Sequence, residues 1–274
     1  MNRLSIEARA TLIGMLAEGN SLRSATRLSG VSINTVSKLL VDVGTGCAKY
    51  HNEHVRNLKT RRVQADEIWS FVYAKAKNVP EEMKAFGVGD VWTWTAMDAD
   101  SKLMISYLVG ARDAGYAYEF MQDVASRLTN RVQLTTDGHK PYLTAVEDIF
   151  GIDIDYAQLV KIYGTEQMPS ESRYSPPKCL GARPTTVMGN PDPKHISTSY
   201  IERQNLTLRM MNRRFTRLTN AFSKKIENHK HSIALHFMHY NFCRIHKSLR
   251  ITPAMQAGIS NHVWSLEELA ALAN

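Results

Sequence analysis

Residues 63–72 read Val-Gln-Ala-Asp-Glu-Ile-Trp-Ser-Phe-Val, and this stretch governs how the rest of the chain is interpreted. Apolar and polar residues partly alternate in this stretch, which is also rich in β-branched and aromatic residues, and this pattern predicts a β-strand. Asp66 lies inside the strand, where a carboxylate is unfavourable unless it faces a polar site. We therefore expect a strand that presents an acid to a functional site.

Further strand and helix patterns follow this stretch and predict an α/β fold. Strands are expected at residues 91–98, 103–109, 131–136 and 152–162, and helices at residues 114–128 and 141–150. The first three strands form an antiparallel meander, and the fourth ends on Asp137. This order, closed by a helix from about residue 200, is the ribonuclease-H-like topology. It places Asp66 and Asp137 on adjacent central strands, at an end where an α/β site is built.

The closing helix opens a long basic segment between residues 200 and 250. This segment holds eleven Lys and Arg against two acids, one of which is Glu202. Glu202, Asn205 and Arg209 are spaced by three and four residues, so they share one helix face. A carboxylate at the head of a cationic helix indicates a metal ligand beside a phosphate-binding surface. The alternative is an amphipathic surface helix whose Glu and Arg have no special role.

Residues 164–199 interrupt the α/β pattern. They hold six of the nine prolines: Pro169, Pro176, Pro177, Pro184, Pro191 and Pro193. This density is incompatible with a regular helix or a central strand. We expect a Pro-rich loop insertion close to the active site, because loops of this length are usually functional or disordered.

The first 48 residues have a different pattern and predict an all-α unit. Helices are expected at residues 6–18, 21–28 and 33–43, with a tight turn at Gly30 between the last two. This is a helix-turn-helix arrangement. The outward positions of the third helix, where base edges or phosphates are reached, are Asn34, Thr35, Ser37 and Lys38. The alternative is a three-helix bundle used for packing or dimerisation.

Composition limits the partners and the compartment. The net charge is +8 with a pI of about 9.4, and the basic segment accounts for the whole excess. Concentrated positive charge favours a polyanionic partner, most simply nucleic acid. The three cysteines are far apart and match no metal or disulfide pattern, which is consistent with a reducing cytoplasm. We find no signal sequence or bilayer-spanning run, and therefore expect no membrane association.

Three carboxylates, Asp66, Asp137 and Glu202, are expected to converge from separate elements. Oxygen ligands suit hard cations, so Mg²⁺ is the expected cofactor, with Mn²⁺ as the alternative ion. Two such ions about 4 Å apart activate a water or a 3′-hydroxyl and stabilise the leaving oxygen. The metals also offset the repulsion among the three acids. Arg209, about 10 Å along the helix from Glu202 by the helical rise, is placed to hold a DNA phosphate.

The chain resembles the DDE transposases of bacterial insertion sequences, most closely the insertion-sequence-one family. The residues that carry this resemblance are Asp66-Glu67-Ile68-Trp69, Thr136-Asp137-Gly138 and the run from Ile201 to Arg209. A later segment, residues 240–249 followed by Thr252-Pro253-Ala254, is similar to one in many integrases and transposases. The long separation between Asp137 and Glu202 departs from the family pattern, as does the lack of an N-terminal cysteine zinc motif.

The resemblance implies an enzyme that binds element-end DNA, nicks it, and joins the freed 3′-hydroxyl to target DNA. Its partners are then the terminal inverted repeats and target DNA, held by a homodimer or higher assembly in the bacterial cytoplasm at the nucleoid. Further DNA contacts are expected from the cationic helices, at Asn205, Arg209, Arg213 and Arg214. Two alternatives stay open: a non-catalytic DNA-binding regulator derived from a transposase, and a nuclease of the same fold.

These expectations divide the chain into four parts. They are a helix-turn-helix domain at 1–48, a basic linker at 49–62, a catalytic domain at 63–258 with its insertion at 164–199, and a C-terminal helix at 259–274. The last helix is indicated by Ser265-Leu266-Glu267-Glu268, which has the sequence of a capping box.

Overall fold

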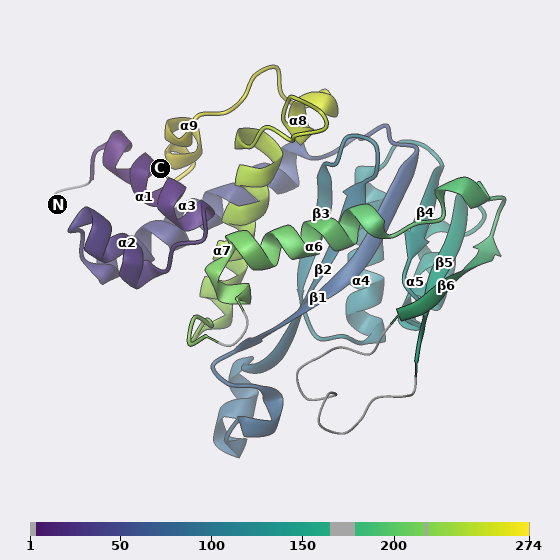
Figure 1. The fold of residues 1–274 in the computed structure, drawn as a ribbon, viewed down its shortest axis with the longest axis horizontal. Helices are drawn as coiled ribbons and strands as arrows, with labels where there is room; N and C mark the ends of the chain where they lie inside the picture. The colour runs from purple at the N-terminus through teal and green to yellow at the C-terminus, as the bar shows by residue number, and fades with distance from the viewer. Residues whose placement is uncertain (1–3, 165–178, 217–218, 274) are drawn as a thin grey trace.

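A six-stranded mixed sheet forms the centre of the molecule (Figure 1). The structure is a computed structural model and describes residues 4–164, 179–216 and 219–273. The strands are β1 Arg62–Val72, β2 Gly89–Asp98, β3 Met104–Gly110, β4 Val132–Thr136, β5 Ile154–Tyr163 and β6 Cys179–Met188. Their spatial order is β3-β2-β1-β4-β5-β6. Strands β1, β4 and β5 are parallel to one another, whereas β2, β3 and β6 pair antiparallel with their neighbours.

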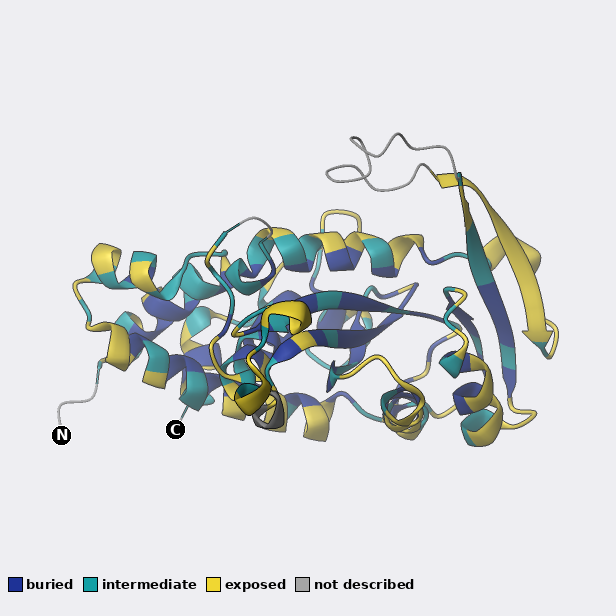
Figure 2. Ribbon diagram, turned by 90° about the horizontal axis from the view of Figure 1, so that it is seen from below, coloured by how far each residue is buried: buried dark blue, intermediate teal, exposed yellow. Residues whose placement is uncertain are grey.

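Helices cover both faces of this sheet. The main helices are α1 Ile6–Ala17, α2 Leu22–Ser29, α3 Ile33–His54, α4 Ala114–Arg127, α5 Pro141–Phe150, α6 Ser199–Met211, α7 Ile226–Met238, α8 Pro253–Gln256 and α9 Leu266–Ala271. Helices α4 and α5 lie on one face, and α6 crosses the other (Figure 1). In Figure 2 the strands are mostly dark blue between these layers, and β6 is the exposed yellow edge.

Two apolar cores correspond to the two faces. Ala65 on β1 packs with Phe120 and Leu134 in the core beneath α4 and α5. Ile68 of the same strand packs with Ile201 in the core beneath α6 and α7. Because successive strand residues face opposite sides, these assignments place Asp66 on the α6 face and Glu67 on the α5 face.

The element order predicted for residues 63–163 is confirmed strand by strand and helix by helix. The meander of β1, β2 and β3 and the two parallel crossovers that follow produce the observed mixed sheet. In the parallel register, Ala65 of β1 lies opposite Thr136 of β4, so the next residues along the two strands are Asp66 and Asp137.

The N-terminal helices begin where their caps were expected. The Ser5, Ser21 and Ser32 side chains each accept a backbone N–H in the first turn of α1, α2 and α3. Gly30 closes α2 with a φ of +72°, a conformation that is inexpensive only for glycine. Helix α3 is much longer than predicted, however, and continues to His54.

The predicted linker at 49–62 therefore needs correction, since residues 49–54 are the end of α3. The sequence indicated a helix end at Gly44, but Gly44 and Gly46 lie inside the helix and have another role. A Cβ at Gly44 would lie 2.5 Å from the Cβ of His231 on α7, and one at Gly46 would lie 2.0 Å from the carbonyl oxygen of Leu272. These glycines let α3 pack closely on its neighbours, and that packing maintains the helix.

The predicted Pro-rich loop also needs correction. Residues Cys179–Met188 form β6, which pairs antiparallel with β5 at the edge of the sheet. Pro184 is accepted there because an edge strand has one side without ladder hydrogen bonds. The first part of the insertion, with Pro169, Pro176 and Pro177, lies outside the described residues.

The C-terminal helix α9 spans Leu266–Ala271 within the predicted part 259–274, and its capping box is present in full. Ser265 Oγ accepts the backbone N–H of Glu268, and the Glu268 carboxylate accepts the backbone N–H of Ser265. Helix α9 packs against α1, so the two ends of the chain meet (Figure 1). Among the described helices, none has the length and apolar character required to cross a bilayer.

Candidate active site

Asp66, in the middle of β1, and Asp137, directly after the carboxyl end of β4, come together. The parallel register delivers the two acids to neighbouring positions. One Asp66 oxygen accepts the backbone N–H of Glu67 at 2.9 Å. One Asp137 oxygen accepts the backbone N–H of His139 at 2.9 Å. Each carboxylate is thus held by a local backbone bond that leaves its second oxygen for another partner.

The second oxygen of Asp66 accepts a hydrogen bond from Asn205 on α6. Asn205 Nδ2 lies 2.9 Å from Asp66 Oδ2. Thr95 on β2 supports this amide, because its hydroxyl lies 3.4 Å from Asn205 Oδ1. Asn205 is only 5% exposed and is bonded to Asp66, and its contact with DNA stays a prediction. Its position on the Glu202 face is as predicted, but that face turns inward and orients the Asp66 carboxylate.

Glu67 is a third acid at this point, and it was not predicted to have a role in the site. One oxygen each from Asp66, Glu67 and Asp137 lie within 4.8 Å of one another. The Glu67 side chain is 1% exposed, and its Oε2 accepts Arg112 Nη2 at 3.1 Å. The same Nη2 lies 3.8 Å from Asp137 Oδ2. Arg112 also lies over the Trp92 ring at 4.7 Å, which fixes its guanidinium between the two acids.

Glu202 lies near this group but is not a member of it. Its carboxylate accepts Lys161 Nζ of β5 at 2.8 Å and is also hydrogen-bonded by the Thr198 hydroxyl. Both side chains of the Lys161–Glu202 pair are about one third exposed, at 32% and 37%. The negative charge of Glu202 still acts on Asp66, whose pKa it raises. The predicted trio is therefore present as a close pair plus a neighbour that has its own counter-ion.

The crowding of acids has an electrostatic consequence. Burial, followed by repulsion from Asp137, raises the pKa of Asp66 to about 7, even though hydrogen bonds from Glu67 and Asn205 oppose the rise. Burial and Asp137 likewise raise the pKa of Glu67 to about 7, against the effect of Arg112. Carboxylates that are hard to ionise together are stabilised by any added cation. The site is therefore suited to a positive ligand.

The donor set identifies the kind of cation. Every candidate ligand atom in the group of Asp66, Glu67 and Asp137 is a carboxylate oxygen. Oxygen donors are those that Mg²⁺ and other hard cations prefer. Within the part of the chain that the structure describes, this is the one group of three or more such side chains close enough to hold an ion. The observed residues therefore fit a divalent metal, with Glu202 one side chain away.

The other residues predicted to contact DNA lie on two surfaces. Asn34, Thr35 and Lys38 are exposed on the first turns of α3, and Ser37 is half-buried. Lys38 Nζ forms a 2.5 Å ion pair with Asp42 one turn later. Arg209, Arg213 and Arg214 are half-buried at the end of α6 and just beyond it. Contact of these side chains with DNA stays a prediction.

Three side chains at the site were not found by sequence reasoning: Glu67, Arg112 and Lys161. Glu67 had a signal, since it directly follows Asp66 in a strand of otherwise apolar and neutral residues. Arg112 and Lys161 had none, because a single basic residue before a helix or in a strand is commonplace. Only the sheet order places them beside the acids.

No family model matches the chain, and no curated protein matches it in sequence. Some solved structures are similar. A Mos1 transposase paired-end complex with the left transposon end is 14% identical, with 57% of this chain and 60% of that chain covered and a TM-score of 0.26. The alignment thus spans less than two thirds of the Mos1 protein.

A piggyBac transposase synaptic complex with hairpin DNA is 11% identical, with 100% of this chain and 71% of that chain covered and a TM-score of 0.43. A Mos1 strand transfer complex is 12% identical, with coverages of 86% and 78% and a TM-score of 0.26. With TM-scores this low, the superpositions do not establish a shared fold. The proposal below rests on this chain's own side chains.

Proposed function

We propose that the protein is a DDE-type transposase that cleaves DNA at element ends and transfers the freed strand to target DNA. One observation carries the proposal. Asp66 within β1 and Asp137 directly after β4 adjoin on parallel strands, and α6 crosses over them with Glu202 and with Asn205 bonded to Asp66. The strand order β3-β2-β1-β4-β5 is that of a ribonuclease-H-like domain, and the sequence motifs of the insertion-sequence-one family lie on these elements.

Asp66, Asp137 and Glu202 would hold divalent metal, Mg²⁺ or Mn²⁺, with Glu67 as a further ligand within reach of the first two. When bound, the metal supplies charge stabilisation and an activated oxygen nucleophile. Asn205 orients Asp66 and limits its rotation, because the amide is itself buried and held by Thr95. Such support fixes a ligand oxygen in place before the ion arrives.

Arg112 and Lys161 have a double role in this proposal. Without metal they neutralise Glu67 and Glu202. Metal would take over that charge balance, and both cations would then be available to a DNA phosphate at the same edge. Arg112 suits this role because its planar guanidinium binds phosphate through two parallel hydrogen bonds. Arg209 would hold a further phosphate along α6.

DNA is the proposed partner, and two copies of the chain would bring the two element ends together. The exposed side chains at the start of α3 would contact the terminal inverted repeat, as recognition helices do. The wide basic segment would hold the flanking duplex through its phosphates, so binding would weaken steeply with salt. The compartment would be the bacterial cytoplasm, at the nucleoid.

The test is strand cleavage and strand transfer of labelled element-end DNA with Mg²⁺, for the wild type and for Asp137→Asn. We expect the substitution to lower both activities by at least about a hundredfold, as loss of a metal ligand does. Asp148→Asn is the matched control, since Asp148 is exposed on α5. Full activity of Asp137→Asn would show that the catalytic assignment is wrong.

A binding protein without cleavage activity is the second candidate. The observation that favours it is the pairing of Glu202 with Lys161, which leaves Glu202 outside the close group of acids. The same assay separates the candidates. A wild type that shifts element-end DNA in a gel, yet never cuts it with Mg²⁺ or Mn²⁺, is a regulator. Cleavage without joining indicates a nuclease.

A further inference from the structure

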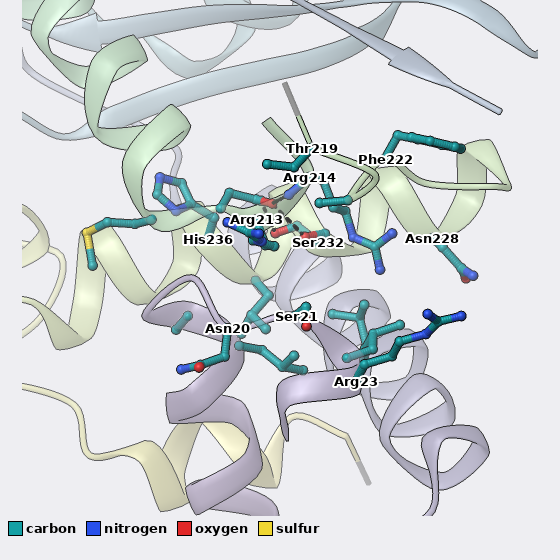
Figure 3. Close-up of a pocket in the computed structure, with 18 of the residues that line it drawn as sticks. Asn20, Ser21, Arg23, Arg213, Arg214, Thr219, Phe222, Asn228, Ser232 and His236 are labelled. Atoms are coloured by element: carbon teal, nitrogen blue, oxygen red, sulfur yellow. Dashed lines mark hydrogen bonds between the residues drawn. The ribbon is translucent and has the colours of Figure 1, made fainter. Parts of the chain in front are cut away.

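A large cleft lies between the N-terminal helices and the segment that follows α6 (Figure 3). Its volume is about 880 Å³, within the range of small-molecule sites. One wall comes from the α1–α2 turn, with Asn20, Ser21 and Arg23. The opposite wall comes from residues 211–214 and 219–222 and from α7, and includes Arg213 and Arg214. The cleft is separate from the carboxylate site, none of whose acids lines it.

The lining of the cleft is cationic. Four basic side chains contribute to it: Arg23, Arg213, Arg214 and Lys224. The lining residues that the structure describes include no Asp or Glu. Amides and hydroxyls, such as Asn228 and Ser232, provide further hydrogen-bonding groups. A concave surface of one charge sign concentrates ligands of the opposite sign, so the ligand is an anion.

The positive charge of Arg214 is not balanced by a carboxylate among the described residues of the protein. Its Nη1 donates to Ser223 Oγ at 2.6 Å, and no described carboxylate lies within ion-pair distance. Burial lowers the pKa of Arg214 to about 10, which records the cost of holding the guanidinium away from water. A guanidinium has five N–H donors, and a phosphate accepts two of them in parallel. An oxyanion in the cleft would offset this cost.

His236 on α7 is a buried polar group in the wall of the cleft. The residue lines the cleft and is 5% exposed, yet its Nε2 has no hydrogen-bond partner. Burial lowers its pKa to about 3, so the ring is neutral near pH 7. A neutral imidazole has one donor and one acceptor nitrogen. The Nε2 nitrogen is enclosed by protein atoms, so the arginines, and not this ring, would hold an anion in the cleft.

The cleft is also partly apolar. Leu22 and Ile33 line it from the helix-turn-helix side, and Phe222 lines it from the opposite side. The Phe222 ring is held against Phe71 with centroids 5.1 Å apart. A rigid aromatic ring beside cations is a surface on which nucleic-acid bases stack. A ligand that matches both the cationic and the apolar parts of the lining has an anionic group and a flat apolar group.

We propose that this cleft binds a phosphorylated nucleoside, with the phosphate on Arg213 and Arg214 and the base against the apolar wall at Phe222. Its source is either an unpaired nucleotide of DNA or a free nucleotide. The DNA source rests on the function proposed above, whereas the site chemistry does not. Nucleotide binding here would link the helix-turn-helix to the end of α6, the helix that carries Glu202.

The experiment measures binding to the full-length protein in EDTA, where strand cleavage cannot occur. The probes are a fluorescein-labelled single-stranded hexanucleotide, dAMP and inorganic phosphate. Arg213→Gln and Arg23→Gln should each weaken hexanucleotide binding by about tenfold, the effect of losing one charge-assisted hydrogen bond. Arg203→Gln is the matched control, since Arg203 is exposed on α6 outside the cleft, and it should change binding less than about twofold.

Two further variants test the two halves of the ligand. Phe222→Ala should weaken binding of the hexanucleotide and dAMP by about tenfold or more, and of phosphate hardly at all. Asn228→Asp should weaken binding of all three probes, because a carboxylate repels the phosphate. The same variant should raise the melting temperature of the unliganded protein, because the new carboxylate relieves the uncompensated cations. A higher melting temperature would show that the Asn228→Asp protein is folded, so its weaker binding could not be attributed to unfolding.

The probes then decide the source. Competition of dAMP against the hexanucleotide indicates a free-nucleotide site, and hexanucleotide binding that dAMP does not displace indicates DNA. Equal affinity of wild type, Arg213→Gln and Arg23→Gln for all probes would overturn the proposal. The proposal would also be overturned if dAMP bound no more tightly than inorganic phosphate, because the base would then contribute nothing to the affinity. Failure of strand transfer with intact binding here would count against the proposed enzyme and not against this cleft.

Discussion

At the scale of single residues, the pKa of Asp66 is subject to two opposing effects. Its carboxylate is buried beside another acid, which raises its pKa to about 7. Its neighbours Asn205 and Glu67 nevertheless donate hydrogen bonds that favour the charged form. Such a conflict is typical of side chains kept for function at a cost in stability.

This conflict predicts a pH-dependent gain from Asp66→Asn in metal-free buffer. The pKa of Asp66 in the folded protein lies above its ordinary value of 3.8, so its stabilising contribution is complete below pH 3.8 and is lost as the pH rises through 7. At about 1.4 kcal/mol per pKa unit, reduced because Asp66 is partly exposed, Asp66→Asn should raise the free energy of unfolding by about 2 kcal/mol at pH 8. At pH 4 the gain should vanish.

Urea unfolding of both proteins at the two pH values measures this difference. Asp148→Asn, on the surface of α5, is the control and should change stability little at either pH. A gain that is the same at pH 4 and pH 8 would mean that the Asp66 charge is not its source. Strand cleavage should be lost in Asp66→Asn at every pH.

Arg112 provides the opposite case, a cation that stabilises a buried acid. Arg112→Gln should lower the free energy of unfolding by roughly 2 kcal/mol at pH 8, because the Glu67 carboxylate would be left buried without its counter-ion. The loss should be smaller at pH 6, where Glu67, with a pKa of about 7, takes up a proton instead.

Lys38→Gln is the comparison for Arg112, since Lys38 forms an ion pair while 72% of its side chain is exposed. It should cost about 0.5 kcal/mol or less at both pH values. Equal, pH-independent losses in the two variants would show that Glu67 does not need Arg112. Calorimetry of Mg²⁺ binding adds a second measurement: Arg112→Gln should bind metal more tightly, because a competing cation has been removed.

At the scale of elements, α3 shows how packing overrides a local stop signal. Glycine ordinarily weakens a helix interior by about 1 kcal/mol relative to alanine. Gly44 is buried within α3, where a Cβ would lie 2.5–2.8 Å from the Cβ, Cα and carbonyl oxygen of His231. The close contact between α3 and α7 therefore depends on the absent side chain.

Gly44→Ala should consequently destabilise the protein by about 1–3 kcal/mol, although helix propensity alone predicts a gain. Gly115→Ala on α4 is the matched control. Its added Cβ meets only Asp113 Oδ1 at 3.4 Å, an ordinary van der Waals distance, so stability should stay the same or rise. Thermal unfolding followed by circular dichroism measures both. If Gly44→Ala stabilised the protein, α3 and α7 would be able to move apart without a loss in the free energy of unfolding.

At the scale of the whole molecule, the N-terminal helices are part of the main core. One continuous apolar cluster includes Leu12 and Leu40 of the first helices, Leu235 of α7 and Leu269 of α9. Helix α3 continues beyond residue 48 and packs along α7. The N-terminal helices are therefore packed into the same core as the rest of the described chain.

A fragment of residues 1–48 should accordingly lack stable structure, because it retains the helices but loses most of their apolar partners. Circular dichroism and proteolysis of the fragment measure this, with the full chain as the reference. In the full chain, the N-terminal helices and the sheet should unfold in a single transition. A fragment that is folded at 25 °C would restore the independent domain at 1–48.

Much of the sheet and its acids was readable from local patterns. The meander, both crossover helices and the positions of Asp66 and Asp137 follow from period-two alternation, caps and turns, which are local properties. The Pro-rich insertion was not readable, because β6 has no alternation of its own and exists only by pairing with β5. The length of α3 was not readable either, because Gly44 indicates a helix end unless its partner helix is known.

The amino-acid sequence by itself determined the order of the elements from β1 to β5, the two acids on β1 and directly after β4, and the helix that carries Glu202. The tertiary structure decided which groups surround those acids. It placed Glu67, Arg112 and Lys161 at the site, bonded Asn205 to Asp66, and built the cationic cleft from segments far apart in the chain. The reason is physical: periodicity reports the face of an element, whereas charge balance depends on neighbours that only packing brings together.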